Sequence, residues 1–275
     1  MDNLTLSLQQ NSSNPECDEP YKTIYFVLNS LLLFFGFPTT AIVIAKLLNK
    51  MYKTRSVSAG EVFLLQINVT NVCLFISYLL LFLNSLHVDY SYTLYVLFYS
   101  PTLTARPVFL LATSVIFYLA IAHPVTYMTT KTRLHWEWLV VTLVWSYALV
   151  VTLVIIFNKY GLFHPIYIAV FLISLPITMF FNITTLRALM SKRSRISGQT
   201  LNPVKRKAFR IILSIQVALL LYYVPRTFFF IHYYLIPSDR ERFMCAEGPV
   251  IMMLPKISEF AMPVILLYSV QKLGV

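Results

Sequence analysis

Trp138–Phe157 reads WLVVTLVWSYALVVTLVIIF, an apolar run of 20 residues without a charged side chain. The hydrocarbon core of a bilayer is about 30 Å thick, and a helix needs about 20 residues to cross it. The run therefore predicts a transmembrane helix, and it decides which kind of fold to expect from the rest of the chain.

Six more apolar runs of sufficient length make seven expected spans. In order, the seven are Ile24–Ala45, Val62–Leu86, Leu94–Ala122, Trp138–Phe157, Pro165–Leu189, Ala208–Ile236 and Pro249–Val270. Five prolines lie inside them: Pro38, Pro107, Pro176, Pro225 and Pro263. Proline ends a soluble helix. In a bundle, neighbouring helices and waters satisfy the freed carbonyls, so we expect kinks.

The composition indicates the same fold class. Hydrophobic residues make up 58% of the 275 residues and charged residues 12%, against roughly 45–50% and about 25% in soluble domains. The sequence lacks the two-residue alternation of apolar and polar residues that is typical of a membrane β-barrel. Because lipid cannot hydrogen-bond to unpaired backbone groups, the spans must be helices. We expect an all-α membrane protein with an extracellular tail at 1–23, a seven-transmembrane domain at 24–270 and a short cytoplasmic tail at 271–275.

The charges of the loops predict the orientation. Basic residues gather after the first, third and fifth runs and at the C-terminus: Lys46, Lys50, Lys53, Arg55, Lys131, Arg133, Arg187, Lys192, Arg193, Arg195, Lys205, Arg206, Lys207, Arg210 and Lys272. By the positive-inside rule this face is cytoplasmic, against anionic lipids. The N-terminus is then outside, in agreement with N-glycosylation sequons at Asn3 and Asn11. We expect a multi-pass protein of the plasma membrane and no nucleic-acid partner, because the basic residues lie in short loops.

The three cysteines show no metal-binding spacing, so we expect no metal site. Cys17 in the tail and Cys245 in the last external loop share an oxidising compartment, and we expect them to form a disulfide. Two free thiols are the alternative. Cys73, in the second run, reads as a small packing residue.

Local sequence resembles one family of membrane proteins. Phe117–Pro124 reads FYLAIAHP and is similar to the Asp-Arg-Tyr segment, with the loop that follows it, of rhodopsin-like (class A) G-protein-coupled receptors. Further similar landmarks follow in order and cover nearly the whole chain: Trp145, Pro176, Lys205–Lys207, Tyr222–Pro225 (YYVP) and Met262–Leu266 (MPVIL).

The chain also departs from the family pattern. Ile116 and Phe117 stand where the family has Asp-Arg, and Asn71 stands at the aspartate of the sodium pocket. Met262 and Leu266 replace the asparagine and tyrosine of helix seven. Tyr92 stands where the helix-three cysteine belongs, so the usual external disulfide is not expected.

The resemblance implies a receptor that senses an extracellular small molecule and signals to a heterotrimeric G protein when helix six swings outward. It places Phe117, Tyr118, Arg187, Lys207 and Arg210 toward the G protein. A receptor fold that no longer couples is the alternative, because Phe117 replaces the arginine.

Ionisable groups within the spans cost about 2.5–3.5 kcal/mol each by insertion scales, so each calls for a partner or a task. In the family register, Arg106 and Glu259 face the site where relatives bind sodium. We expect them to form an ion pair in place of the ion, with Asn71 hydrogen-bonded beside it. The alternative is that the two are separate.

A ligand site is expected in the outer half of the bundle. Its expected residues are Tyr99, Tyr222, Tyr223, Arg226, His232 and Lys256. Two cations would meet an anionic group and the aromatics would bury its apolar part, which favours a carboxylate or phosphate-bearing ligand. In the alternative, Lys256 pairs with Glu259 and the tyrosines only pack.

Other function classes remain open. A transporter or channel would use the intramembrane charges as a path, although no internal repeats or paired broken helices occur. A bitter-taste-type receptor also lacks the Asp-Arg-Tyr motif, but Pro225 and Pro263 argue against it. We expect neither an enzyme, since the five histidines fall one per segment, nor a cofactor. Lys256 does fall at the retinal-binding position of opsins, but Tyr95 stands at the counter-ion position.

Overall fold

The computed structural model describes residues 26–54, 59–85, 92–123, 125–127, 136–158, 163–194, 217, 220–229, 231–232, 251, 253–259, 261 and 264–265. Within these residues the chain is helical and contains no strand. The labelled elements are η1 (Leu32–Gly36), α3 (Phe37–Thr54), α4 (Ala59–Ser85), α5 (Tyr92–Ala122), α7 (Trp136–Phe157) and α8 (Phe163–Ser194). The predicted all-α fold is confirmed for this part of the chain.

Five helices of the described part are long and apolar enough to cross a membrane. They cover Phe26–Lys53, Ala59–Asn84, Thr93–Ala122, Trp136–Phe157 and Ile168–Ala188. Each coincides with one of the first five expected runs, so a multi-pass membrane protein is confirmed. The helical residues 220–229 and 253–259 fall within the sixth and seventh expected runs.

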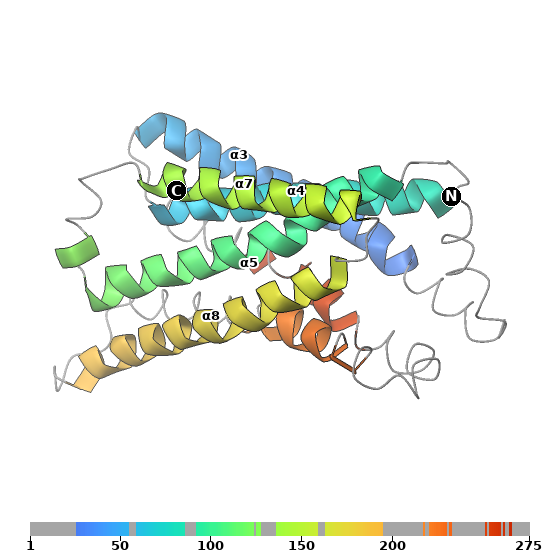
Figure 1. The fold of residues 1–275 in the computed structure, drawn as a ribbon. Helices are drawn as coiled ribbons and strands as arrows, with labels where there is room; N and C mark the ends of the chain where they lie inside the picture. Colours follow the sequence, from blue (N-terminus) through green and yellow to red (C-terminus); the bar gives the residue numbers. More distant parts are fainter. Residues whose placement is uncertain are drawn as a thin grey trace.

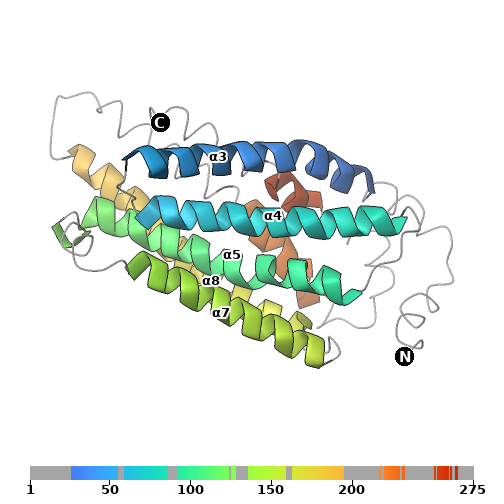
Figure 2. The same cartoon turned by 90° about the horizontal axis from the view of Figure 1, so that it is seen from above.

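Helix α5 is the central element of the bundle. It packs against α4, α7 and α8, while α3 packs on α4. The two orthogonal views show the same order, with α3, α4 and α5 side by side and α8 along a different side of α5 from α4 (Figures 1 and 2). A residue near the middle of α5 is therefore enclosed from several sides.

The prolines do not end the helices. Helix α5 continues through Pro101 and Pro107, and α8 continues through Pro176. Residues 220–229 are helical on both sides of Pro225. The π-helical turn η1 ends at Gly36, two residues before Pro38, which cannot donate a backbone hydrogen bond to the preceding turn. The chain thus stays helical at these prolines, and the expected kinks remain a prediction.

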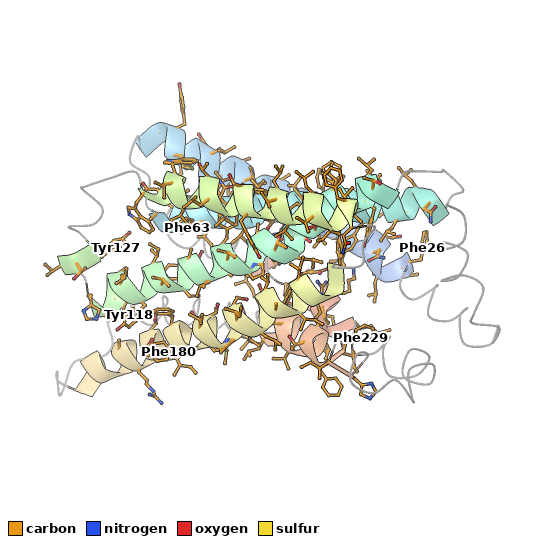
Figure 3. All side chains as sticks on the ribbon, in the orientation of Figure 1. Phe26, Phe63, Tyr118, Tyr127, Phe180 and Phe229 are labelled. Carbon is orange, nitrogen blue, oxygen red and sulfur yellow. The ribbon has the colours of Figure 1, made fainter. Side chains whose placement is uncertain are left out.

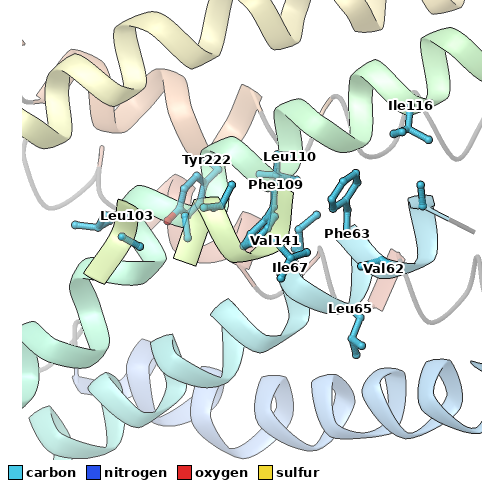
Figure 4. Packing of buried hydrophobic residues seen from close by; sticks show 14 of the residues in the cluster. Val62, Phe63, Leu65, Ile67, Leu103, Phe109, Leu110, Ile116, Val141 and Tyr222 are labelled. Atoms are coloured by element: carbon cyan, nitrogen blue, oxygen red, sulfur yellow. The ribbon is translucent and has the colours of Figure 1, made fainter. Parts of the chain in front are cut away.

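The core lies between α4, α5 and the residues around Tyr222. Phe63 and Ile67 of α4 and Phe109 of α5 are fully buried. Figure 4 shows Tyr222 beside Leu103 of α5, within the same cluster of buried side chains. Residues 220–229 therefore enter the core against α5 and do not lie only on the outside of the bundle.

One interhelical hydrogen bond joins α7 to α4. The Trp145 indole Nε1 donates to Gln66 Oε1 over 2.9 Å, and the Trp145 ring packs at 6.1 Å from the ring of Phe109. Gln66 is buried, and burying its amide oxygen without a hydrogen bond would cost free energy. The bond explains why a tryptophan, which carries one N–H donor, suits this position of the fourth span.

We expect this bond to be measurable by a double-mutant cycle. Trp145→Phe and Gln66→Leu each remove one partner, and their thermal unfolding in detergent is compared with that of the double variant. Interhelical hydrogen bonds in membranes couple by about 0.6 kcal/mol on average and about 1.7 at most. We therefore expect a positive coupling in that range. Strictly additive losses would mean that the bond contributes nothing.

The close contact between the first and second spans depends on Gly36. A Cβ at Gly36 would lie 2.7 Å from Cζ of Phe75, and Phe75 is buried. Its ring also makes an edge contact with Phe37 at 6.2 Å. The ring has little space to retreat because buried side chains are close-packed.

Gly36→Ala is therefore expected to lower the thermal midpoint, although alanine favours a helix over glycine by about 1 kcal/mol. Adding Phe75→Leu to Gly36→Ala removes the clashing ring atoms and should recover part of the loss. A midpoint that rises in Gly36→Ala would contradict the tight contact.

Candidate functional site

The carboxylate of Glu259 is the centre of a buried charged cluster. Its Oε1 accepts a hydrogen bond from Arg226 Nη2 at 2.6 Å, within an ion pair. Its Oε2 accepts from the Tyr78 hydroxyl at 2.5 Å and lies 3.8 Å from Lys256 Nζ. All four side chains are buried. One carboxylate thus joins α4, through Tyr78, to residues 220–229 and 253–259.

Tyr222 contacts two guanidinium groups. Arg226 Cζ lies 4.3 Å and Arg106 Cζ lies 4.6 Å from the centre of its ring. The Tyr222 hydroxyl accepts a hydrogen bond from Arg226 Nη1 at 2.8 Å. Cation–π contacts of this kind are worth about 2 kcal/mol or more when desolvated. Tyr222 therefore connects Arg106 of α5 to the cluster around Glu259.

Lys256 also contacts an aromatic ring through its amine. Its Nζ stands 3.5 Å from the centre of the Tyr78 ring, while the hydroxyl of the same ring bonds Glu259. Tyr78 was not among the site residues predicted from the sequence. The sequence contained one indication of its role. Tyr78 lies seven residues after Asn71, so both side chains are on one face of α4.

The expected ion pair between Arg106 and Glu259 is wrong. Arg226 occupies that place, because its side chain reaches Glu259 directly and Arg106 lies over Tyr222 instead. The hydrogen bond expected from Asn71 to this pair is also not formed. Asn71 is buried, and its Nδ2 has no hydrogen-bond partner among the described residues.

Most buried hydroxyls of the spans need no functional explanation. Thr113 donates to the carbonyl of Phe109 at 2.7 Å, and Ser77 donates to that of Leu74 at 2.6 Å. Such bonds to the preceding turn satisfy a polar side chain within its own helix. Arg106 is different: it is 2% exposed, and its buried Nε and Nη1 have no hydrogen-bond partner among the residues that the structure describes.

The structure brings together part of the expected ligand site. Tyr222, Arg226 and Lys256 belong to the charged cluster, and the Tyr223 ring lies 4.7 Å from that of Phe171 in α8. Because both cations contact Glu259, the arrangement agrees with the alternative in which Lys256 pairs with this carboxylate.

Two further expected residues lie on their own helices. Tyr99 stacks on Tyr95 at 5.1 Å in α5 and packs against the cluster that contains Tyr78. His232 packs 6.1 Å from Phe228, four residues earlier in the chain.

At one end of the bundle, aromatic side chains of α5 and α8 pack against each other. Tyr118 contacts Phe181 at 5.5 Å between ring centres, and its hydroxyl lies 3.3 Å from Nε2 of His123. Figure 3 shows Tyr118 and Tyr127 at this end and Phe26 at the opposite end. Burial, and then the charges of Glu61 and Glu137, raise the pKa of Tyr127. Its phenol therefore stays neutral between the starts of α4 and α7.

The remaining predicted residues have different outcomes. Phe117 is half-buried in α5 and Arg187 is exposed on α8. Cys73 is a free cysteine in α4. The other predicted residues lie outside the described ones: Asn3, Asn11, Cys17, Lys207, Arg210 and Cys245. No group of three or more His, Cys, Asp or Glu side chains in the described ranges could hold a metal ion.

Neither the known family models nor the curated proteins match this chain. The site is therefore characterised by its chemistry. Arg226 and Lys256 lie at the carboxylate of Glu259, and Arg106 lies over the ring of Tyr222, which bonds Arg226. The two guanidinium groups are always charged. The part of the cluster that the structure describes is a cation-rich site between helices.

We expect Glu259→Gln to be the most destabilising single change in this cluster. It leaves Arg226 and Lys256 without their carboxylate, and breaking a buried ion pair typically costs about 3–5 kcal/mol. Arg226→Gln should cost less, because Glu259 keeps Tyr78 and Lys256. Thermal unfolding of the purified protein in detergent measures both.

The double variant Arg226→Gln/Glu259→Gln should unfold at a higher temperature than Glu259→Gln alone, since it removes one of the two cations that have lost the carboxylate. Glu61→Gln serves as the matched control. Glu61 pairs with Lys50 at 2.6 Å in a partly exposed position, where an ion pair is worth about 1 kcal/mol or less. An equal loss from Glu61→Gln and Glu259→Gln would contradict the central role of Glu259.

Proposed function

We propose that this chain is a receptor of the rhodopsin-like, G-protein-coupled kind in the plasma membrane. Residues 208–236 and 249–270 then complete seven spans, and the N-terminus is extracellular. The receptor binds an anionic small molecule within the bundle and signals to a heterotrimeric G protein. The five helices that can cross a membrane and the order of the sequence landmarks support this assignment.

The observation that carries the proposal is the attachment of residues 220–229. Arg226, next to Pro225, is bonded to Glu259 at 2.6 Å, and Tyr222 lies under the guanidinium of Arg106 at 4.6 Å. These contacts tie the segment that should swing in a receptor to α5 and to residues 253–259. A change at this cluster can thus alter the balance between two positions of the segment.

The charges of the cluster favour an anionic ligand. Among the described residues of the cluster, Arg106 and Arg226 alone outnumber the carboxylate of Glu259. A cation would meet repulsion there, whereas an anion lowers the electrostatic cost of keeping two guanidinium groups out of water.

The contact at the inner end supports a conformational readout. Tyr118 takes the place of the family's tyrosine next to the missing arginine, and it packs on Phe181 of α8. In the proposed mechanism, outward movement of residues 220–229 opens the face that Phe117, Tyr118 and Arg187 border. Phe117 offers the G protein an apolar contact in place of an arginine.

The test is G-protein activation in cells that express the full chain, with a panel of lipid acids, small carboxylates and nucleotides. We expect a ligand-dependent signal from the unmodified chain. Phe117→Arg should increase the signal severalfold because it restores the cationic contact, and Phe117→Leu should leave it unchanged.

Silence from both the unmodified chain and Phe117→Arg, at matched surface expression, would overturn the proposal. Ligand-dependent current or uptake under the same conditions would then favour a transporter or channel. A signal from Phe117→Arg alone would mean that the native chain has the receptor fold but does not couple.

A further inference from the structure

The guanidinium of Arg106 has an excess of hydrogen-bond donors in the middle of the bundle. Its Nε and Nη1 together carry three of the five N–H donors of the side chain, and neither has a hydrogen-bond partner in the part of the chain that the structure describes. The side chain is 2% exposed. A buried charge without partners is expensive, and arginine cannot lose its charge to escape that cost. The position therefore calls for a bound group that supplies acceptors.

Glu259 forms no hydrogen bond with Arg106. Its Oε1 is bonded to Arg226, and its Oε2 is bonded to Tyr78 and lies near Lys256. Arg106 contacts the face of the Tyr222 ring, which attracts a cation but leaves the in-plane N–H groups of a guanidinium free to donate. The donors of Arg106 thus remain available beside a completed ion pair.

Residues 220–229 contribute a further donor. The buried Tyr223 hydroxyl has no hydrogen-bond partner within the described ranges, and the Tyr223 ring lies 5.1 Å from that of Tyr222. Tyr222 in turn lies 4.6 Å from Arg106. Cationic donors from α5 and a phenol from residues 220–229 therefore occur around one aromatic ring.

We infer that Arg106 is the anion-binding residue of this bundle and that it takes a carboxylate group, with the Tyr223 hydroxyl as a second donor. Arg226 and Lys256, the cations first assigned to a ligand, instead hold Glu259. A carboxylate has two oxygen acceptors, so it can receive charge-assisted bonds from both Arg106 and Tyr223. The inference deepens the function proposed above, and rests on it only in treating the bound carboxylate as the signal.

The carboxylate can come from two sources. A small acid would reach Arg106 from water, and an amphiphilic acid would bring its headgroup in with an apolar tail against the aromatic side chains. Acetate and laurate represent these two sources, and acetamide and dodecanol are their uncharged counterparts.

The experiment measures the thermal unfolding midpoint of the purified full-length chain in detergent, by tryptophan fluorescence, at constant ionic strength. We expect at least one of the two carboxylates to raise the midpoint, by about 5 °C at saturating concentration, and the uncharged counterpart to have no such effect. A shift with both acids indicates a site open to small carboxylates. A shift with laurate alone indicates an amphiphilic ligand.

Three variants test whether Arg106 is the residue that binds the carboxylate. Arg106→Gln should lose the carboxylate shift. Without carboxylate it should unfold no lower than the unmodified chain, because the lost contact with Tyr222 is offset by the removal of a buried charge that forms no ion pair with the described residues. Tyr223→Phe should raise the half-saturating concentration about tenfold. Lys53→Gln removes an exposed charge at the end of α3 and should keep the full shift.

Two outcomes would overturn the inference. One is the absence of a shift in the unmodified chain with both carboxylates, which needs no variant to fold. The other is an Arg106→Gln variant that keeps the shift, or that is equally destabilised with and without carboxylate, as a purely structural arginine would be. Because no G protein is present, these outcomes are separate from a failure to signal.

Discussion

The described part of the bundle depends on the ion pairs and hydrogen bonds of the Glu259 carboxylate. An unpaired charge in the hydrocarbon region is expensive, and this carboxylate lies 2.6 Å from Arg226 and 3.8 Å from Lys256, which helps both cations to be buried. The same group accepts the hydroxyl of Tyr78 from α4. A single buried anion therefore makes the burial of two cations affordable and positions three parts of the chain relative to one another.

The helices were predictable because spanning a membrane is a property of one segment at a time. Length and hydropathy sufficed for Trp136–Phe157, whose observed start lies two residues before the expected Trp138. The prolines were also predictable as tolerated residues, since a helix enclosed by others can leave a carbonyl to its neighbours. Pro107 and Pro176 lie inside continuous helices, as expected.

The ion pair was mispredicted because its partners depend on how helices rotate about their axes. Sequence register places Arg106 and Glu259 at similar depth, but depth does not say which of two arginines points at the carboxylate. Arg226 reaches it, and Tyr222 stands between Arg226 and Arg106. Tyr78 was missed for a related reason. A tyrosine in an apolar span usually reads as packing, and only the buried acceptor opposite it reveals the role of its hydroxyl.

The division of labour between the two arginines bears on how a bound anion could move residues 220–229. A ligand shifts an equilibrium only by its difference in affinity for the two states. An anion held by Arg106 alone would bind equally well wherever those residues lie, because its donors would all belong to α5. An anion held also by Tyr223 bridges α5 and residues 220–229, so its affinity depends on their separation. The unpartnered donors of both helices, more than the charge of either arginine, are therefore what would make such a site a switch.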